Sequence, residues 1–231
     1  MALTSTLLVR DLSCIVGAVV GGASQIDSYT TTSGSLVFVQ ITTTAAAVTE
    51  AQHFTSISGP SSSLTFLGCK QLSGGTTKCV EWYYAAGGGS TGTSNVTYSG
   101  SGFTTISSQE AFVWEVTGGT GLTILQSAFA KATNATGTVT LGSSVQSGNE
   151  CVYMAAFDSN DTATPGSGWT EITDQNINSL HGYYQRHPTP SGSQNGACTI
   201  TSSIGNASAI VEINNPATVS TGGGWGFIPI K

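Results

Sequence analysis

The chain has 231 residues, a formal net charge of −6 and only 8% charged residues, whereas charged residues make up roughly 25% of an ordinary soluble domain. Its six basic residues are scattered, which excludes the basic stripe of a nucleic-acid-binding protein and the polybasic patch of a membrane-surface protein. Gly, Ser and Thr number 30, 31 and 34, and 39% of the residues are apolar; this composition excludes disorder and favours strands joined by turns.

The first 24 residues read as N-terminal strands or an arm. Their most apolar run, LSCIVGAVVGG at 12–22, is far shorter than the roughly 20 residues that cross a bilayer. The preceding MALTSTLLVR contains a single Arg and lacks the charged beginning of a secretion signal. We therefore expect a buried strand at 12–20, with neither a membrane anchor nor a removed signal.

Short apolar runs with alternating polarity recur along the chain, separated by clusters of Gly, Ser, Asn and Pro. We expect strands at 4–9, 12–20, 35–43, 48–54, 64–70, 78–86, 93–98, 110–117, 122–130, 136–146, 150–157, 181–187, 197–203 and 207–213. Their spacing is typical of a sandwich or barrel. The pattern predicts an all-β fold: one antiparallel, jelly-roll-like β-sandwich domain over 1–215 and an extended C-terminal tail over 216–231. Short helical turns are expected only at 44–51 and 174–180.

The five cysteines contain no CxxC pair. Zinc sites usually combine closely spaced Cys or His, and His53, His181 and His187 are not at such a spacing, so the sequence predicts no metal centre. Cys69 and Cys79 lie symmetrically about the SGG turn at 73–75. A hairpin there would place them opposite each other and make them a candidate disulfide; the alternative is two buried thiols.

Three strand-like runs each carry one glutamate: CVEWYY at 79–84, AFVWEVT at 111–117 and AIVEIN at 209–214. Side chains alternate between the faces of a strand, so each Glu lies on a mixed face that we expect to be at least partly wet. The alternative is a glycosidase groove, which needs two carboxyl groups about 5 to 9.5 Å apart. No strand holds a second acidic residue on the face of its Glu, so such a pair would have to come from different strands.

Two other motifs suggest chemistry. GGSTG at 88–92 matches G-x-S-x-G, with Asp158 and His181 following in the order of an esterase triad; that motif needs a strand, a sharp elbow and then a helix, and TGTSNVTYSG does not resemble a helix. The oxygen-rich segment from Asp158 to Asp161 could hold calcium, but Asx turns use the same residues. We expect no catalytic site, no cofactor and no enzymatic activity.

Over roughly 25–215, the order of elements resembles a β-sandwich domain that recurs in bacteriophage virion structural proteins and in some bacterial surface proteins. The matching segments are TTTSGSLVFVQI at 30–41, EWYYAA at 81–86, FVWEVTG at 112–118, ATGTVTLGSS at 135–144, SGWTEI at 167–172, YYQRH at 183–187 and AIVEI at 209–213. The resemblance implies a jelly-roll-like sandwich in a virion, as a capsid decoration or cement protein or as a tail or fibre component. It supplies no catalytic residues.

The expected function is therefore that of a capsid decoration protein, located in the virion, which forms a homo-oligomer and contacts other virion proteins. Apolar side chains in the tail, Trp225, Phe227, Ile228 and Ile230, are the candidate partner contacts, because an exposed apolar segment marks an interaction site; alternatively, the tail folds back on its own core. The competing hypothesis is a carbohydrate-binding adhesin module that stacks sugars on exposed aromatic rings. Its candidate platforms are Tyr83, Tyr98, Trp169, Tyr183 and Tyr184.

Overall fold

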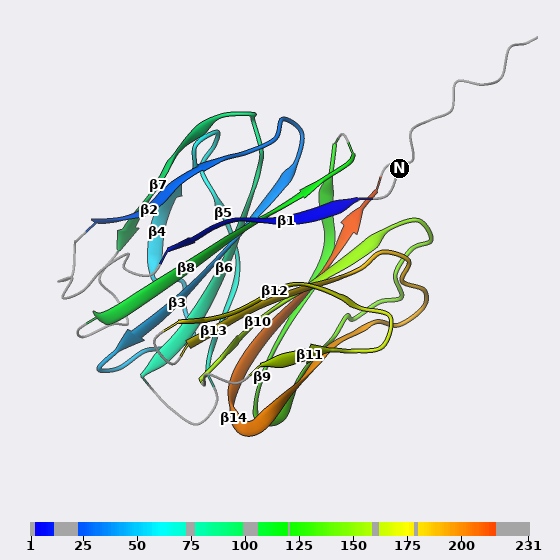
Figure 1. Cartoon of the computed structure of the whole chain (residues 1–231). Helices are drawn as coiled ribbons and strands as arrows, with labels where there is room; N and C mark the ends of the chain where they lie inside the picture. The colour runs from blue at the N-terminus through cyan, green and yellow to red at the C-terminus, as the bar shows by residue number, and fades with distance from the viewer. Residues whose placement is uncertain are drawn as a thin grey trace, which may run out of the picture.

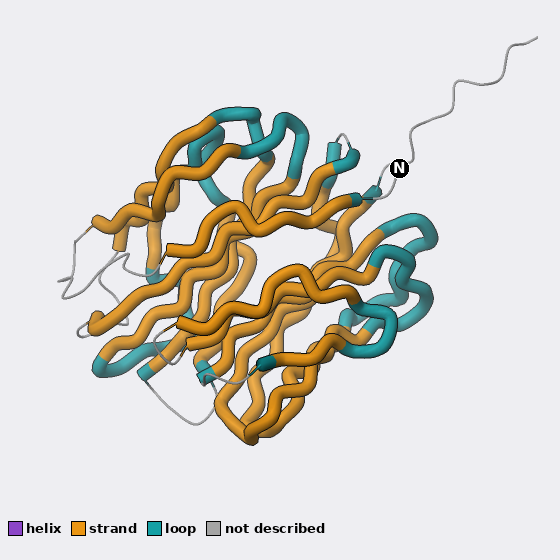
Figure 2. Tube along the Cα trace, viewed as in Figure 1, coloured by secondary structure: helices purple, strands orange, loops and turns teal. Residues whose placement is uncertain are grey.

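The computed structural model describes residues 3–11, 23–72, 77–98, 106–119, 121–158, 162–177 and 180–215. Every regular element in these ranges is a β-strand (Figures 1 and 2), and no helix that could cross a membrane lies within them. The strands are β1 (Thr4–Asp11), β2 (Ala23–Thr30), β3 (Leu36–Ala45), β4 (Phe54–Ser58), β5 (Thr65–Gln71), β6 (Lys78–Ala86), β7 (Thr91–Tyr98), β8 (Ile106–Thr117), β9 (Thr123–Thr140), β10 (Glu150–Phe157), β11 (Ala163–Pro165), β12 (Thr170–Ile177), β13 (Leu180–His187) and β14 (Asn195–Asn214).

The strands form three antiparallel sheets. The central sheet has the order β1-β8-β3-β6-β5, the small sheet has the order β2-β7-β4, and the long sheet has the order β11-β14-β10-β13-β12, with β9 also paired to β14. Figure 1 shows the central sheet between the small sheet and the long sheet. The prediction of an all-β antiparallel sandwich is confirmed, and the small sheet adds a further layer.

The first hydrophobic core lies between the central and long sheets. Trp114 of β8 stacks on Tyr184 of β13, with ring centroids 4.9 Å apart, and Trp82 of β6 lies 5.6 Å from Phe129 of β9. Gly182 faces Phe112, and a Cβ atom at position 182 would lie 2.3 Å from that ring. Large aromatic rings on one sheet therefore pack against small residues or other rings on the opposing sheet, as dense core packing requires.

The second core lies between the central and small sheets. On β3, Leu36 and Phe38 belong to the first core, whereas Val37, Val39 and Ile41 contact the second. The small sheet contributes Ile26, Tyr29, Phe54, Ile57 and Val96 to this core. Because both faces of the central sheet are covered at its inner strands, β3, β6 and β8 are mostly buried, a pattern otherwise typical of parallel sheets.

The third core lies on the outer face of the long sheet. Strands β9 and β14, although separated in sequence by four other strands, form a long antiparallel pair whose register shifts between Thr199 and Ile204. One end of this pair covers Tyr153, Phe157 and Tyr183. A Cβ atom at position 196 would lie 2.3 Å from the Tyr153 ring, so Gly196 allows the backbone of β14 to close over that ring.

Several predicted boundaries are wrong. The strand expected at 48–54 is replaced by β4, and the helical turns expected at 44–51 and 174–180 are not helical in the described residues. The pairs of strands expected at 122–130 with 136–146, and at 197–203 with 207–213, are the single strands β9 and β14, which pair with each other on both sides of the register shift. The sequence analysis missed β2, β11 and β12. The strand predicted at 12–20 and the tail at 216–231 lie outside the described residues.

Candidate functional site

The three strand glutamates are buried, so the expectation of a partly wet face is wrong. The exposed fractions of Glu81, Glu115 and Glu212 are 0%, 4% and 1%. For Glu81 and Glu115 the physical reason is the small sheet, which covers the face of the central sheet that an ordinary two-layer sandwich would leave in water. A buried carboxylate is stable only when it is well hydrogen-bonded.

Glu115 fixes the turn that precedes β3. Its Oε1 atom accepts hydrogen bonds from the backbone N–H of Thr32 and from the Ser35 hydroxyl, the latter at 2.6 Å. Its Oε2 atom accepts the Thr32 hydroxyl at 2.9 Å. The carboxylate therefore holds a loop that is about 80 residues away in sequence, and it has no contact that suggests acid–base catalysis.

Glu212, in the long sheet, also anchors a loop through backbone and side-chain hydrogen bonds. It accepts the backbone N–H of Gln146 at 2.9 Å and the side-chain amides of Asn149 and Gln126, both at 2.5 Å. Burial alone would raise the pKa of Glu212, but these three hydrogen bonds favour the ionised form and together lower it below its usual value.

For Glu150, in contrast, burial outweighs the hydrogen bond and the neighbouring positive charge, so that its pKa is raised. It accepts the backbone N–H of Leu3 at 2.8 Å and lies 3.5 Å from the Arg186 guanidinium. Burial is the largest influence on the pKa of Glu150 and raises it, and the Leu3 hydrogen bond and Arg186 compensate only in part. Glu150 therefore anchors the backbone of Leu3 as Glu212 anchors that of Gln146, but its ionised form is less strongly stabilised than that of Glu212.

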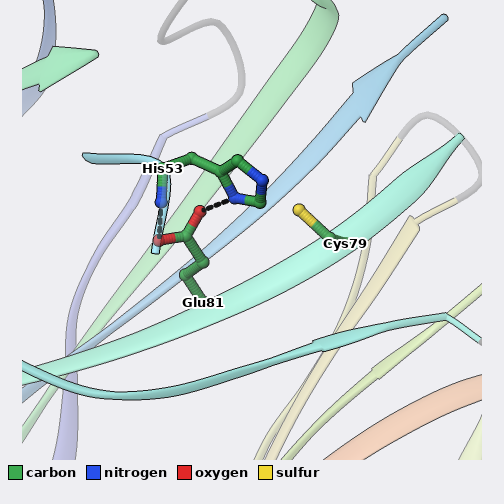
Figure 3. Close-up of side chains that lie close together, drawn as sticks. All are labelled: His53, Cys79 and Glu81. Atoms are coloured by element: carbon green, nitrogen blue, oxygen red, sulfur yellow. Dashed lines mark hydrogen bonds and ion pairs between the residues drawn. The ribbon is translucent and has the colours of Figure 1, made fainter. Parts of the chain in front are cut away.

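Glu81 is the centre of a denser cluster (Figure 3). Its Oε1 atom lies 2.7 Å from His53 Nδ1, and its Oε2 atom accepts the backbone N–H of His53 at 3.1 Å and the Tyr83 hydroxyl. His53 Nε2 lies 3.3 Å from the Thr49 hydroxyl. The thiol of Cys79 completes the group: ligand atoms of His53, Cys79 and Glu81 all lie within 4.8 Å of one another.

The local strand geometry explains this convergence. Cys79, Glu81 and Tyr83 alternate with Val80 and Trp82 on β6, so they share the face that meets the small sheet. His53 comes directly before β4, a strand of that small sheet. Cys69 is the Cα partner of Glu81 on the neighbouring strand β5 and points to the same side, because directly paired residues share a face.

The cluster is not arranged for nucleophilic catalysis. Burial raises the pKa of Cys79 well above its usual value, and the Glu81 charge and Cys69 add to that effect. Burial is also the main cause that raises the pKa of Tyr83, followed by Glu81. A reactive cysteine needs the opposite conditions, a lowered pKa and access to solvent. What the cluster offers is one sulfur, one imidazole and one carboxylate as adjacent donors, all with 0% exposure.

The register of β5 and β6 does not place Cys69 and Cys79 opposite each other, as the candidate disulfide required. Cys69 pairs with Glu81, and Cys79 pairs with Gln71, so the two cysteines are diagonal neighbours rather than opposite each other, and both are free thiols. The hairpin is offset by two residues from the symmetric arrangement about 73–75. Burial, with the charges of Glu81 and Glu50, raises the pKa of Cys69 to about 11.

The proposed sugar platforms are not on the surface. Tyr83, Tyr183 and Tyr184 are at most 1% exposed, and Trp169 is 8% exposed. The side chain of Tyr98 lies outside the described residues. Tyr83 lies on β6, Tyr183 and Tyr184 lie on β13, and Trp169 directly precedes β12. The sequence does not reveal which other layer covers each of these rings.

The other predicted motifs are not assembled into sites. The GGSTG segment joins β6 to β7 and is followed by a strand, so the helix of a nucleophile elbow is missing there. Asp158 forms an ion pair with Lys78, while Asp161 and the side chain of His181 lie outside the described residues. The candidate tail contacts Trp225, Phe227, Ile228 and Ile230 lie outside them as well.

The sequence analysis missed His53 as a site residue, and no local signal could have found it. His53 and Glu81 are 28 positions apart, and only the packing of the small sheet on the central sheet brings them together. The one available signal was the run LVFVQ at 36–40, whose apolar residues on both faces indicate a strand covered on both sides. No family model matches the chain, and no curated protein or solved structure is significantly similar to it.

Proposed function

We propose that this chain is a structural protein of a virion, most specifically a bacteriophage capsid decoration or cement protein. The observation that carries the proposal is the distribution of side chains. In the described residues, the His53–Cys79–Glu81 cluster and four of the five candidate sugar-stacking rings are buried, and Leu125 is the one exposed large apolar side chain. Such a surface suits a building block rather than an enzyme or a ligand receptor.

The interior supports a mechanical role. Three cores lie in series, and buried glutamates tie loops or terminal segments to the sheets at Glu81, Glu115, Glu150 and Glu212. Networks of satisfied buried hydrogen bonds rigidify a structure. A rigid, sparsely charged block is what a shell subunit needs, because each weak contact is repeated by symmetry over many copies.

The contact surface that we propose lies at the end of β14. This strand ends at Asn214, which pairs with Thr123, and Ile213 pairs with Ile124. Leu125, with 46% exposure, is therefore next to the point where the chain continues into 216–231. The apolar residues Trp225, Phe227, Ile228 and Ile230 of that segment would join Leu125 in binding a neighbouring copy or another shell protein.

The adhesin alternative has no specific observation in its favour. A sugar-binding module needs aromatic rings that a ligand can reach, and four of its five candidate rings are buried. A pocket beside Tyr29, Pro60 and Leu64 has a volume of only about 10 Å³, room for about one water molecule. We therefore retain the structural hypothesis alone.

The test is to count this chain in density-gradient-purified particles by quantitative mass spectrometry. A copy number comparable to that of the main shell protein is expected; a handful of copies would place the chain in a tail or fibre, and its absence from particles would overturn the proposal. Deletion of 216–231 should reduce incorporation while leaving the thermal unfolding midpoint of the sandwich unchanged. The matched control is Ser127→Ala, an exposed change two positions from Leu125 on β9, which should not affect incorporation.

A further inference from the structure

We propose that His53, Cys79 and Glu81 form a structural zinc site that ties the small sheet to the central sheet. The inference goes beyond the proposed virion role, because it assigns a metal to a buried cluster whatever the protein assembles with. It rests on the identity, placement and burial of the three side chains shown in Figure 3.

The donor set fits zinc. Thiolate sulfur, imidazole nitrogen and carboxylate oxygen are its three usual protein ligands, whereas calcium and magnesium take oxygen ligands almost alone. The three donor atoms lie within 4.8 Å of one another. Tetrahedral ligands at zinc bond lengths lie ~3.3–3.6 Å apart. The atoms furthest apart therefore need to approach by about 1 Å. His53 Nδ1 and Glu81 Oε1, which are hydrogen-bonded at 2.7 Å, need to separate by roughly 0.6 Å or more to admit the ion between them, and side-chain rotations supply both movements.

Binding is balanced in protons and charge. Zinc takes the sulfur of Cys79 as a thiolate, and the thiol proton leaves to solvent. His53 coordinates through Nδ1, and its ring proton then resides on Nε2, where the Thr49 hydroxyl at 3.3 Å can accept it. Such a partner on the second ring nitrogen is the normal way to orient a ligating histidine. The thiolate and the Glu81 carboxylate together cancel the charge of the ion, so the buried site becomes neutral.

Cys69 lies beside the cluster but is not one of its three donors. It lies opposite Glu81 on β5 and on the same face, and it is partly exposed whereas Cys79 is fully buried. A metal ion arriving from solvent would therefore meet Cys69 first and pass inward to Cys79. The site itself holds three protein donors from two segments, β6 and the residue before β4.

The experiment uses the full-length chain, purified without chelators and then stripped with a chelator at neutral pH. The wild type is titrated with zinc sulfate, and in parallel with cobalt chloride, a spectroscopic probe for zinc sites. We expect one equivalent of zinc per chain by elemental analysis, a sulfur-to-cobalt charge-transfer band, and a thermal midpoint that rises with zinc concentration as linkage requires. Magnesium chloride should produce none of these effects.

The variants test the ligands. Cys79→Ser and His53→Gln should each lose the charge-transfer band and at least tenfold in zinc affinity, measured on the folded fraction by native mass spectrometry. Cys198→Ser is the matched control, because Cys198 is also a buried thiol but lies in the third core, and it should bind zinc as the wild type does. Absence of stoichiometric zinc binding by the wild type would overturn the proposal even if every variant failed to fold. An unchanged cobalt band in Cys79→Ser would overturn it as well.

Discussion

The Glu81 and Glu212 regions solve the same structural problem with different chemistry. In both, a strand glutamate is buried and accepts the backbone N–H of a distant residue, His53 in one case and Gln146 in the other. The remaining partners of Glu212 are neutral amides, whereas those of Glu81 are an imidazole and a phenol, with a thiol nearby. The comparison teaches that anchoring a loop needs only an acceptor, so the titratable partners of Glu81 call for a further explanation, which a metal would supply.

The largest loss of unfolding free energy is expected from Glu81→Ala. The change would leave the Tyr83 hydroxyl and two N–H groups of His53 without their acceptor in a site with 0% exposure, and removal of one partner from a buried charged network costs about 3–5 kcal/mol. Urea unfolding followed by tryptophan fluorescence measures the loss. The control is Glu171→Ala, an exposed glutamate on β12, which should change the unfolding free energy little; an equal loss in both variants would contradict the anchoring role.

Glu212→Gln should lower the unfolding free energy by an intermediate amount. The new amide keeps one acceptor oxygen but points an N–H₂ group at the amide donors of Gln126 or Asn149. A buried donor left without an acceptor costs about 1–3 kcal/mol. The same unfolding experiment measures it, and a cost as large as that of Glu81→Ala would erase the distinction between the two regions.

The unfolding free energy of the wild type should depend on pH more strongly than that of Glu212→Gln. Because the folded-state pKa of Glu212 is lowered from the reference value of 4.5, the unfolded chain binds this proton more readily than the folded chain. The stabilisation is therefore present above the unfolded-state pKa and is lost as the pH falls below 4.5 through the folded-state pKa. Unfolding free energies measured between pH 6 and pH 3, values chosen as roughly spanning this window, should fall more steeply in the wild type than in Glu212→Gln. Parallel curves would contradict the assignment.

Glu150→Gln should have the smallest effect, with the opposite dependence on pH. Its folded-state pKa is raised above 4.5, chiefly by burial, so the ionised form is disfavoured in the folded chain. Its contribution to stability therefore declines as the pH rises from the unfolded-state to the folded-state pKa. A neutral amide that still accepts the Leu3 N–H at this position should change stability at neutral pH by less than about 1 kcal/mol. A large loss would show that the Arg186 pairing outweighs burial.

Much of the sheet structure could be predicted because strand alternation is a local property. The runs containing Trp82, Trp114 and Tyr153 each became a strand near the expected position. The burial of their polar faces could not be predicted, since alternation reports two different faces but does not say what covers either one. The lengths of β9 and β14 were missed for a similar reason: alternation does not reveal that Gly137 and Gly196 make room for Tyr153 beneath two long paired strands.

The cluster of His53, Cys79 and Glu81 could not be predicted from the sequence at all. Metal motifs are recognised from short spacings between ligands, and here Cys79 and Glu81 are two positions apart on one strand while His53 comes from another layer. Each residue has an ordinary explanation on its own. The arrangement exists only after two sheets have packed, so it is a property of the tertiary structure and not of any segment.

The double coverage of the central sheet has a consequence for hydrogen exchange. Strand β3 is paired on both edges, to β6 and β8, and nearly all of its residues are buried, so no local fluctuation at a sheet edge or face frees its amides. The amide of Val39 should exchange with solvent only when the whole domain opens. Its exchange rate would therefore report the global free energy of unfolding, and the deuterium content of this one strand would measure how often the whole domain opens.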